Sequence, residues 1–298
     1  MDVRHLELLR ELADRGSITA VARASHRTVS AVSQQLRTAQ REFGMALTEP
    51  DGRGLRLTEA GRLLADGGRR VQTTVAQVQA EWDAYRNDAG GSVSILAFPS
   101  SAAVFYPAVV AAADLAGIDL RLDDADLAEV EFAERTADYD IVVAHSLDRR
   151  RPAGTDGLVV RQVAVEPLDI AMAPGHPLAA LPTLRAADLA GQRWIGVPEG
   201  YPFDSVLRGI AATLDETLDV RQRLRDNRVA ESLVRTGDVL AVLPRFTTVP
   251  DDGLVLREIV DVPAERTLSA IMRPDRARRR AVTTVLDAIV EAMTSAAG

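Results

Sequence analysis

The sequence contains no cysteine and no lysine. Without cysteine the chain forms no disulfide and offers no thiolate to a metal, which agrees with a reducing compartment. Without lysine, every reaction that needs a Schiff-base or P-loop lysine is excluded, and all 35 basic side chains are arginines. The N-terminus also lacks the apolar segment of a signal peptide, so we expect a cytoplasmic protein.

Motifs for catalysis and metal binding are missing as well. Four histidines are scattered through the chain without the spacing of metal ligands: His5, His26, His145 and His176. The glycines of Gly52-Arg53-Gly54 lack the third glycine of a dinucleotide fingerprint, and no G-x-S-x-G elbow occurs. Asp123, Asp124 and Asp126 resemble an acid–base set, but consecutive acids in a loop are usually solvated. We therefore expect no enzymatic activity, no metal and no cofactor.

The composition is that of a globular protein with unevenly distributed charge. The chain has 298 residues, 47% hydrophobic and 26% charged, which fits two or three domains. Its net charge is −8, but residues 1–62 hold ten arginines against eight acidic side chains, which leaves +2 there and −10 in the remainder. A mildly positive segment on an acidic body fits a nucleic-acid-binding module carried by a domain that does not touch nucleic acid.

Residues 17–57 predict two short helices joined by a tight turn and followed by a glycine-bearing wing. A further helix over residues 3–15 precedes them and packs behind them. The expected helix boundaries are residues typical of caps: Gly16 and Gly44 at C-terminal ends, and Ser17 and Thr28 at N-terminal ends. The third helix therefore runs from Thr28 to Phe43.

Two opposite faces distinguish the third helix. Its apolar residues recur at helical spacing and predict one buried face: Val32, Leu36, Ala39 and Phe43. The opposite face carries hydroxyls, an amide and guanidinium groups: Ser30, Ser33, Gln34, Arg37 and Arg41. Such a face suits a helix that enters a DNA major groove with its N-terminus first. The alternative is an ordinary amphipathic helix with a solvated polar face.

The wing after this helix favours DNA over the alternative. Asp51-Gly52-Arg53-Gly54 places an arginine at the tip of a short turn, and such an arginine fits insertion into a minor groove. The predicted DNA-binding residues are Ser17, Thr19, Thr28, Val29, Ser30, Ser33, Gln34, Arg37 and Arg53.

A long helix is expected from the cap Thr58 to about residue 86. Its apolar residues form a seam for a partner helix: Leu64, Val71, Val75, Val78, Trp82 and Tyr85. Gly67-Gly68 weakens the first half of this seam, and the alternative is packing within the same subunit. We favour a dimerising linker helix, because two reading helices on a two-fold axis match a palindromic site.

From Val93 onward, strand and helix patterns alternate, which predicts α/β sheets with mainly parallel strands. Residues 89–113 carry no charge, but their glycines and prolines favour a strand, a turn and a helix over a membrane span. The expected elements include strands 158–165 and 168–173 and helices 103–116 and 127–137. Two lobes follow, with the chain crossing between them near Val165 and returning near Arg266.

A cleft between these lobes is the expected ligand site. Ligands of open α/β sheets bind beyond the carboxyl ends of strands, and a helix N-terminus offers N–H groups to an anion. Ser100 and Ser101 lie between the first strand and its helix, so they either hold a carboxylate or only cap the helix. His145 either faces the cleft or packs as a neutral side chain. The predicted effector-binding residues are Ser100, Ser101, Ala102, His145, Tyr201 and Phe203.

Taken together, these motifs resemble the LysR-type transcriptional regulators over nearly the full length of the chain. The matching segments are 16–22, 28–36, 54–61, 173–178 and 239–245, together with Gly44 and Leu47. The resemblance implies a winged helix-turn-helix, a dimerising linker helix, a two-lobed effector domain like a periplasmic binding protein, and a dimer of dimers. By position, Thr28, Val29, Ser30, Ser33, Gln34 and Arg53 match the DNA-contacting residues of the family. Departures from the family pattern occur at Val29, Gln34, Thr48 and Pro50.

The resulting expectation is an N-terminal all-α winged helix-turn-helix with a long linker helix, followed by a C-terminal α/β two-lobed domain. We expect the DNA-binding domain over residues 1–61, the linker helix over 62–88 and the effector-binding domain over 89–298. Lobe I takes about 92–165 and 266–298, and lobe II about 166–265. The expected function is sequence-specific transcriptional regulation, controlled by a small, anionic effector, by a protein that self-associates to a dimer or tetramer. The alternatives are a solute-binding protein and, with less support, an enzyme that acts in the interlobe cleft.

Overall fold

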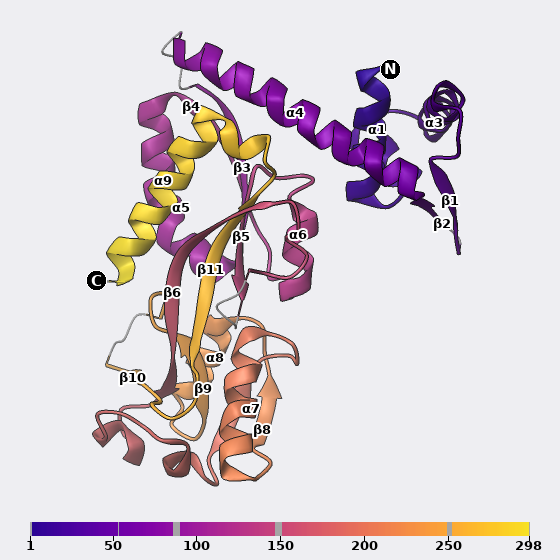
Figure 1. Cartoon of the computed structure of the whole chain (residues 1–298). Coiled ribbons are helices and arrows are strands. Elements are labelled where there is room, and N and C mark those ends of the chain that lie inside the picture. The colour runs from indigo at the N-terminus through magenta and orange to yellow at the C-terminus, as the bar shows by residue number, and fades with distance from the viewer. Residues whose placement is uncertain (1, 53, 86–89, 147–150, 249–251, 298) are drawn as a thin grey trace.

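A small helical head, one long helix and two α/β lobes follow one another along the chain. The computed structural model describes residues 2–52, 54–85, 90–146, 151–248 and 252–297. The two lobes are stacked end to end, and the long helix leads from the head to the far end of lobe I (Figure 1). The head lies beside lobe I and away from lobe II.

The head consists of three helices and a two-stranded wing. Its elements are α1 (Val3–Arg15), α2 (Ile18–Ala24), α3 (Val29–Phe43), β1 (Thr48–Asp51) and β2 (Gly54–Leu57). The four expected caps are confirmed. The hydroxyls of Ser17 and Thr28 accept hydrogen bonds from the N–H groups of Ala20 and Ala31, and Gly16 and Gly44 adopt left-handed φ angles of 71° and 70°. A core that includes Leu9, Val32, Leu36 and Leu47 joins these elements.

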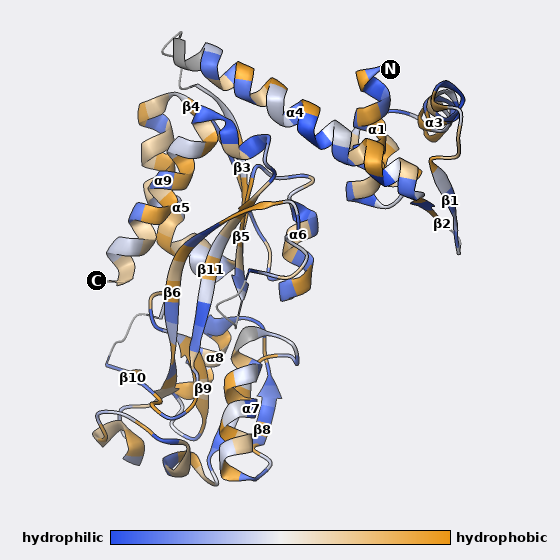
Figure 2. Ribbon diagram, viewed as in Figure 1, coloured by the Kyte–Doolittle hydropathy of each residue, from blue (hydrophilic) through white to orange (hydrophobic). Residues whose placement is uncertain are grey.

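The long helix α4 (Glu59–Tyr85) begins after Thr58, whose hydroxyl accepts the N–H of Gly61. Its first half packs within its own subunit: Leu64 contacts the core of the head, and Gly68 lies directly against α1. Its second half exposes Val75, Val78 and Trp82 by 62%, 60% and 53%. Figure 2 shows apolar residues recurring between polar ones along this stretch. The side chain of Tyr85, also predicted in the seam, lies outside the described residues.

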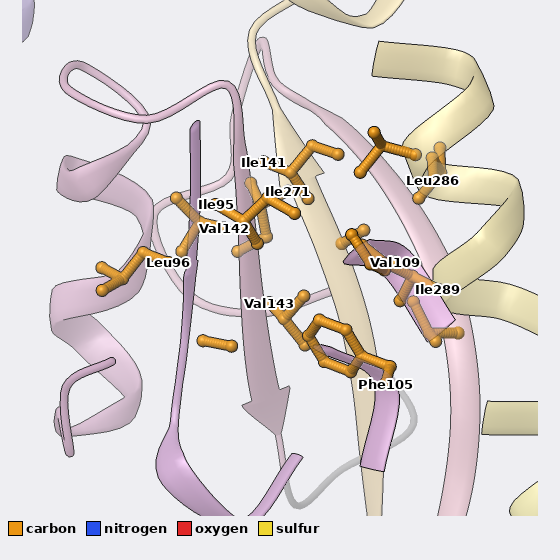
Figure 3. Packing of buried hydrophobic residues seen from close by; sticks show 14 of the residues in the cluster. Ile95, Leu96, Phe105, Val109, Ile141, Val142, Val143, Ile271, Leu286 and Ile289 are labelled. Carbon is orange, nitrogen blue, oxygen red and sulfur yellow. The ribbon is translucent and has the colours of Figure 1, made fainter. Parts of the chain in front are cut away.

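Lobe I is built on three parallel strands with helices on both faces, and a connecting strand described below pairs antiparallel with the last of them. Its elements are β3 (Gly91–Ala97), α5 (Pro99–Ala116), β4 (Ile118–Asp124), η1 (Glu129–Glu131), α6 (Phe132–Arg135), β5 (Ile141–Ser146), η4 (Arg276–Arg278) and α9 (Arg280–Ala297). The strand order β4-β3-β5 is parallel throughout. Helices α5 and α9 cover one face, where Phe105, Val109 and Ile289 pack against Ile95 and Val143 (Figure 3).

Lobe II repeats this plan on a smaller scale. Its elements are η2 (Pro177–Ala180), η3 (Ala186–Leu189), β7 (Arg193–Gly196), α7 (Pro202–Leu214), β8 (Asp219–Arg223), α8 (Asn227–Val234), β9 (Leu240–Pro244) and β10 (Val255–Arg257). The strands β9, β7 and β8 are parallel. Alternate side chains of β7 face opposite layers: Trp194 packs against Phe203 and α7, whereas Ile195 packs against Ala230 of α8.

Two long antiparallel strands join the lobes. Strand β6 (Val159–Met172) leads from lobe I into lobe II, and β11 (Glu265–Met272) returns beside it; Val165 and Arg266 lie in the stretch where the two strands pair. The prediction of two separate strands over 158–165 and 168–173 was wrong, because β6 is continuous. Pro167 does not interrupt it, since this residue lies where β6 leaves β11 and begins to pair with β9. The prediction of mainly parallel strands holds within the lobes only.

Two expected helices have different boundaries. Helix α5 begins at Pro99 rather than at residue 103, because proline at the first helical position has a suitable φ angle. Within 127–137 only η1 and α6 form; Thr136 donates to the carbonyl oxygen of Ala133, which ends the helix. In length and composition α5 would suffice to cross a membrane, and it is the one such helix in the described part of the chain. It is instead a core helix of lobe I.

A cluster of ion pairs fastens the head to lobe I. Asp14 of α1 lies 3.0 Å from the guanidinium of Arg273, which follows β11, and 2.7 Å from that of Arg69 on α4. Arg15 lies 2.7 Å from the carboxylate of Asp138 and also donates to the carbonyl oxygen of Ala137 at 3.0 Å. Head, long helix and lobe I therefore meet at these two neighbouring residues of α1.

Candidate nucleic-acid interface and effector site

The predicted reading face of α3 is open to solvent. Gln34 and Arg37 are exposed and Ser33 is half-buried, whereas Val32 and Leu36 on the opposite face are buried. A helix that reads a DNA groove must have its polar face open to solvent, and the polar face of α3 is open in this way. The other predicted residues at the N-terminal ends of α2 and α3 are also at least partly exposed: Ser17, Thr19, Thr28, Val29 and Ser30. The predicted wing residue Arg53 lies outside the described residues.

Arginines of the head fall into two groups. One group is neutralised by carboxylates within 4 Å: Arg4, Arg10, Arg15 and Arg56. A second group has no carboxylate partner among the described residues: Arg23, Arg27, Arg37 and Arg41. The second group lies on α2, on α3 and in the turn between them. The net charge of the head therefore understates the positive charge around α3, where phosphates would bind.

The interlobe region is built on a buried ion pair. Arg266 of β11 and Glu166 of β6 are cross-strand partners at the point where the chain passes between the lobes. Their side chains are 3% and 0% exposed, and Arg266 Nη2 lies 2.6 Å from Glu166 Oε2. Losing either partner would leave an uncompensated charge in the interior, so each side chain depends on the other for its place there.

One aromatic ring from each lobe flanks Arg266. Its guanidinium lies 4.7 Å from the ring centroid of Phe98 in lobe I and 5.3 Å from that of Phe203 in lobe II. It also donates to the hydroxyl of Ser100 at 3.1 Å. Arg266 therefore contacts both lobes and the N-terminal turn of α5, which makes it the centre of this region.

The first turn of α5 differs in detail from the expectation. Ser100 and Ser101 lie inside the helix rather than before it, because α5 begins at Pro99. Ser100 is half-buried, whereas Ser101 and Ala102 are buried. The hydroxyl of Ser101 donates to the carbonyl oxygen of Phe98, and so do the backbone N–H groups of Ser101 and Ala102. Ser100 is consequently the most accessible of the three predicted residues.

His145 is packed, as in the alternative stated for it. It is 3% exposed and lies edge-on to the rings of Phe98 and Phe132, at 5.2 and 5.0 Å between centroids. Burial, with a smaller contribution from the charge of Arg266, lowers the pKa of His145 to about 3. The imidazole is therefore neutral and forms part of the floor beneath Arg266.

Both lobes contribute further aromatic and charged side chains to the interlobe region, and these charges are of both signs. Tyr201 caps the N-terminal end of α7, and the guanidinium of Arg225 lies 5.6 Å from the centre of its ring. Burial raises the pKa of the Asp126 carboxyl in lobe I, while the charges of Arg225 and Arg266 oppose this rise. Among the described residues, no group of three His, Cys, Asp or Glu side chains is placed to hold a metal ion.

Comparison with known proteins decides the identity of these parts. Residues 3–62 match the model of the bacterial regulatory helix-turn-helix protein of the lysR family, and residues 86–294 match that of the LysR substrate binding domain. The chain belongs to the LysR family of transcriptional regulators. This assignment decides against a solute-binding protein of transport.

Relatives of this regulator match it along its length. The DNA-binding transcriptional dual regulator OxyR of Escherichia coli is 22% identical over 294 residues, 97% of this chain and 95% of its own. The small neutral protease regulatory protein of Streptomyces coelicolor is 28% identical over 282 residues, 91% and 86% of the two chains. The transcriptional dual regulator GltC of Bacillus subtilis is 24% identical over 263 residues, 83% of this chain and 85% of its own.

Solved structures share the fold of this LysR-family chain. A full-length OxyR variant from Pseudomonas aeruginosa matches with a TM-score of 0.68 and 17% identity, over 97% of this chain and 94% of its own. Full-length CbnR in complex with its target DNA matches with a TM-score of 0.52 and 19% identity, over 99% and 100% of the two chains. At these identities the likeness establishes the architecture, a winged helix-turn-helix head followed by a two-lobed α/β domain.

Sequence reasoning missed the ion pair at the centre of the interlobe region. Glu166 and Arg266 mark the two chain crossings, and each is a charged residue at the edge of an apolar strand pattern. A charge in such a strand is a signal for burial with a partner of opposite sign. The two residues are 100 positions apart, so only the pairing of β6 with β11 shows that they meet.

Proposed function

We propose that the polar face of α3 reads an operator in duplex DNA and that a small anionic effector binds between the lobes to control this activity. The observation that carries the proposal is the exposed, carboxylate-free set of arginines around Ser33 and Gln34. Side chains near the start of α3, among them Thr28, Val29 and Ser30, are the candidates for base edges. The candidates for phosphates and the minor groove are Arg37, the half-buried cap Ser17, the exposed Thr19 of α2 and the wing residue Arg53.

Selection from a random-sequence duplex pool tests this proposal. The full-length protein should enrich a palindromic sequence, and its affinity for that duplex should fall with added salt. Ser33→Arg should abolish preference for the selected sequence, because a guanidinium replaces a small hydroxyl in the groove. Arg193→Ala in lobe II serves as the control, because it changes the net charge of the protein away from the head. Unchanged preference in Ser33→Arg would contradict the role of α3.

The effector contacts that we propose are the hydroxyl of Ser100 and the aromatic walls at Tyr201 and Phe203, with Arg266 beneath them. Ser101, Ala102 and His145 support this surface from below, since all three are buried. A thermal-shift screen with small carboxylic acids identifies the binding class. Ser100→Tyr should remove the stabilisation by the best compound and keep affinity for the selected duplex; retained stabilisation would contradict the site.

The relatives include an activator of hydrogen-peroxide-inducible genes. This chain has no cysteine. Peroxide sensing by oxidation of a thiol is therefore not available to it, and we infer that its signal is a bound small molecule rather than thiol oxidation. Because its relatives are regulators, we further infer that it has no catalytic role and acts in the cytoplasm.

We also infer that the chain dimerises through the second half of α4. Val75 and Val78 are three residues apart and more than half exposed, the spacing of a helix–helix seam. Val78→Glu should lower the molar mass measured by light scattering, whereas Gln77→Glu on the neighbouring exposed position should not. An unchanged mass for Val78→Glu would place the dimer contact elsewhere.

A further inference from the structure

The turn between α2 and α3 holds one arginine in a fixed position. His26 adopts a left-handed φ of 52°, which lets the chain reverse within three residues. The backbone N–H of Arg27 then donates to the carbonyl oxygen of Ala22 at 2.9 Å. Arg27 therefore leaves the turn from an ordered backbone immediately before Thr28, the cap of α3.

An amide holds the side chain of Arg27. Its Nη1 donates to Gln35 Oε1 at 2.6 Å, and Gln35 Nε2 donates to the carbonyl oxygen of Arg4 at 2.9 Å. Gln35 is thus anchored on α1 at one end and orients Arg27 at the other. Because an amide is neutral, this contact fixes the guanidinium without cancelling its charge.

The charge of Arg27 is otherwise uncompensated in the described part of the head. Arg27 is exposed and has no carboxylate within 4 Å there. The nearby Arg4 contrasts with it, since its guanidinium lies 2.6 Å from the carboxylate of Asp2. An arginine whose guanidinium is held in place but not neutralised by a carboxylate is suited to bind an anion from another molecule.

The position of Arg27 beside the flank of α3 indicates which anion it binds. Gln35 lies on the flank of α3 between its buried face and its reading face, at ~100° per residue. A major groove is about 12 Å wide and a helix with its side chains is about 10–12 Å across, so the flanks of a reading helix lie against the phosphate strands. We propose that Arg27 binds a backbone phosphate of duplex DNA and that Gln35 positions it. The proposal rests on the proposed function of α3.

Salt titration of DNA binding tests the contact. The full-length protein and Arg27→Ala are titrated with the duplex selected by the wild type and with a scrambled duplex of equal length. Each phosphate contact contributes about 0.9 to the slope of log affinity against log salt, so Arg27→Ala should reduce that slope by about one contact. Affinity should fall by a similar factor, roughly 3- to 10-fold, on both duplexes, because a phosphate carries no sequence.

Two further variants test the positioning role of Gln35. Gln35→Glu pairs with Arg27 and should reduce the slope as Arg27→Ala does, but it should add little in the Arg27→Ala background. Arg193→Ala in lobe II removes an equal charge far from the head and should leave the slope unchanged. Equal melting temperatures establish that the variants are folded.

Three results would overturn the proposal. If the slope of log affinity against log salt is unchanged in Arg27→Ala, then Arg27 is a solvated cation that contacts no phosphate. A loss confined to the selected duplex makes it a base contact. A full additional loss from Gln35→Glu in the Arg27→Ala background makes the amide independent of Arg27. Failure of the wild type to enrich any duplex is a distinct result, since it also removes the proposed function itself.

Discussion

His145 shows how one buried side chain links the structure to pH. The unfolded chain takes up a proton on this imidazole near pH 6.5, whereas the folded protein does so only at a pKa of about 3. Its contribution to stability is therefore complete above pH 6.5 and is lost as the pH falls towards 3. At pH 5 the loss amounts to about 2 kcal/mol.

Replacement of this histidine should remove that dependence. In His145→Phe, the difference in unfolding free energy between pH 7.5 and pH 5 should shrink by about 2 kcal/mol, as measured by urea denaturation at both pH values. Val109→Ala also disturbs the core of lobe I but removes no titrating group, so it should leave the difference unchanged. An equal effect of both substitutions would show that burial of His145 does not govern the response.

The ion pair between Glu166 and Arg266 leads to a second prediction. Glu166→Gln leaves the guanidinium of Arg266 buried without a counter-charge and should destabilise the protein by about 3–5 kcal/mol. Glu49→Gln breaks an exposed pair with Arg56 and should change stability by less than about 1 kcal/mol. Chemical denaturation of both variants measures the contrast, and similar small losses would contradict the importance of burial.

Adjacent glycines in α4 illustrate packing between elements. A Cβ atom at Gly68 would lie 2.6 Å from the carbonyl oxygen of Leu6 in α1, whereas one at Gly67 would have only the side-chain end of Arg70 within 4 Å, at 3.8 Å. Gly68 therefore permits the close approach of α1 and α4. The sequence pattern treated both glycines as a weakness of the helix seam, because the pattern contains no information on the neighbouring helix.

These glycines should respond in opposite directions to the same substitution. Gly67→Ala should stabilise the head by up to about 1 kcal/mol through helix propensity. Gly68→Ala gains the same propensity but forces α1 away, and should destabilise the head by about 1–3 kcal/mol in denaturation experiments. Stabilisation by both substitutions would mean that α1 yields without cost.

Local signals predicted the elements best. Caps depend on a residue and its neighbours within one turn, so Gly16, Ser17, Thr28 and Gly44 were placed correctly from the sequence alone. The sequence pattern misplaces the start of α5, because a proline followed by two serines is typical of a loop, whereas here Pro99 is the first residue of the helix. The pair Glu166–Arg266 depends on strand pairing across 100 residues, which no local pattern contains.

At the scale of the whole molecule, the ion pairs at Asp14 and Arg15 hold the head on lobe I. The Asp14–Arg273 pair is largely buried, with side chains 17% and 10% exposed. Arg273→Met should therefore loosen the head, with a loss of roughly 1–3 kcal/mol at this contact. Because the chain has no cysteine, cysteines introduced as Glu7→Cys and Glu134→Cys carry spin labels at these two positions only.

The distance distribution between those labels measures the change. It should broaden in Arg273→Met and stay narrow in Arg161→Met, which breaks an exposed pair with Asp287 inside the body of the lobes. A narrow distribution in both variants would show that other contacts suffice to hold the head.

The head is attached to lobe I rather than to lobe II, so the two lobes differ in how directly they are connected to DNA that the head binds. Lobe I is anchored twice, by α4 and by the Asp14 cluster, while lobe II is tied to it by β6 and β11. A duplex held by the head would therefore be coupled directly to lobe I, and a change in the angle between the lobes would displace lobe II relative to that duplex.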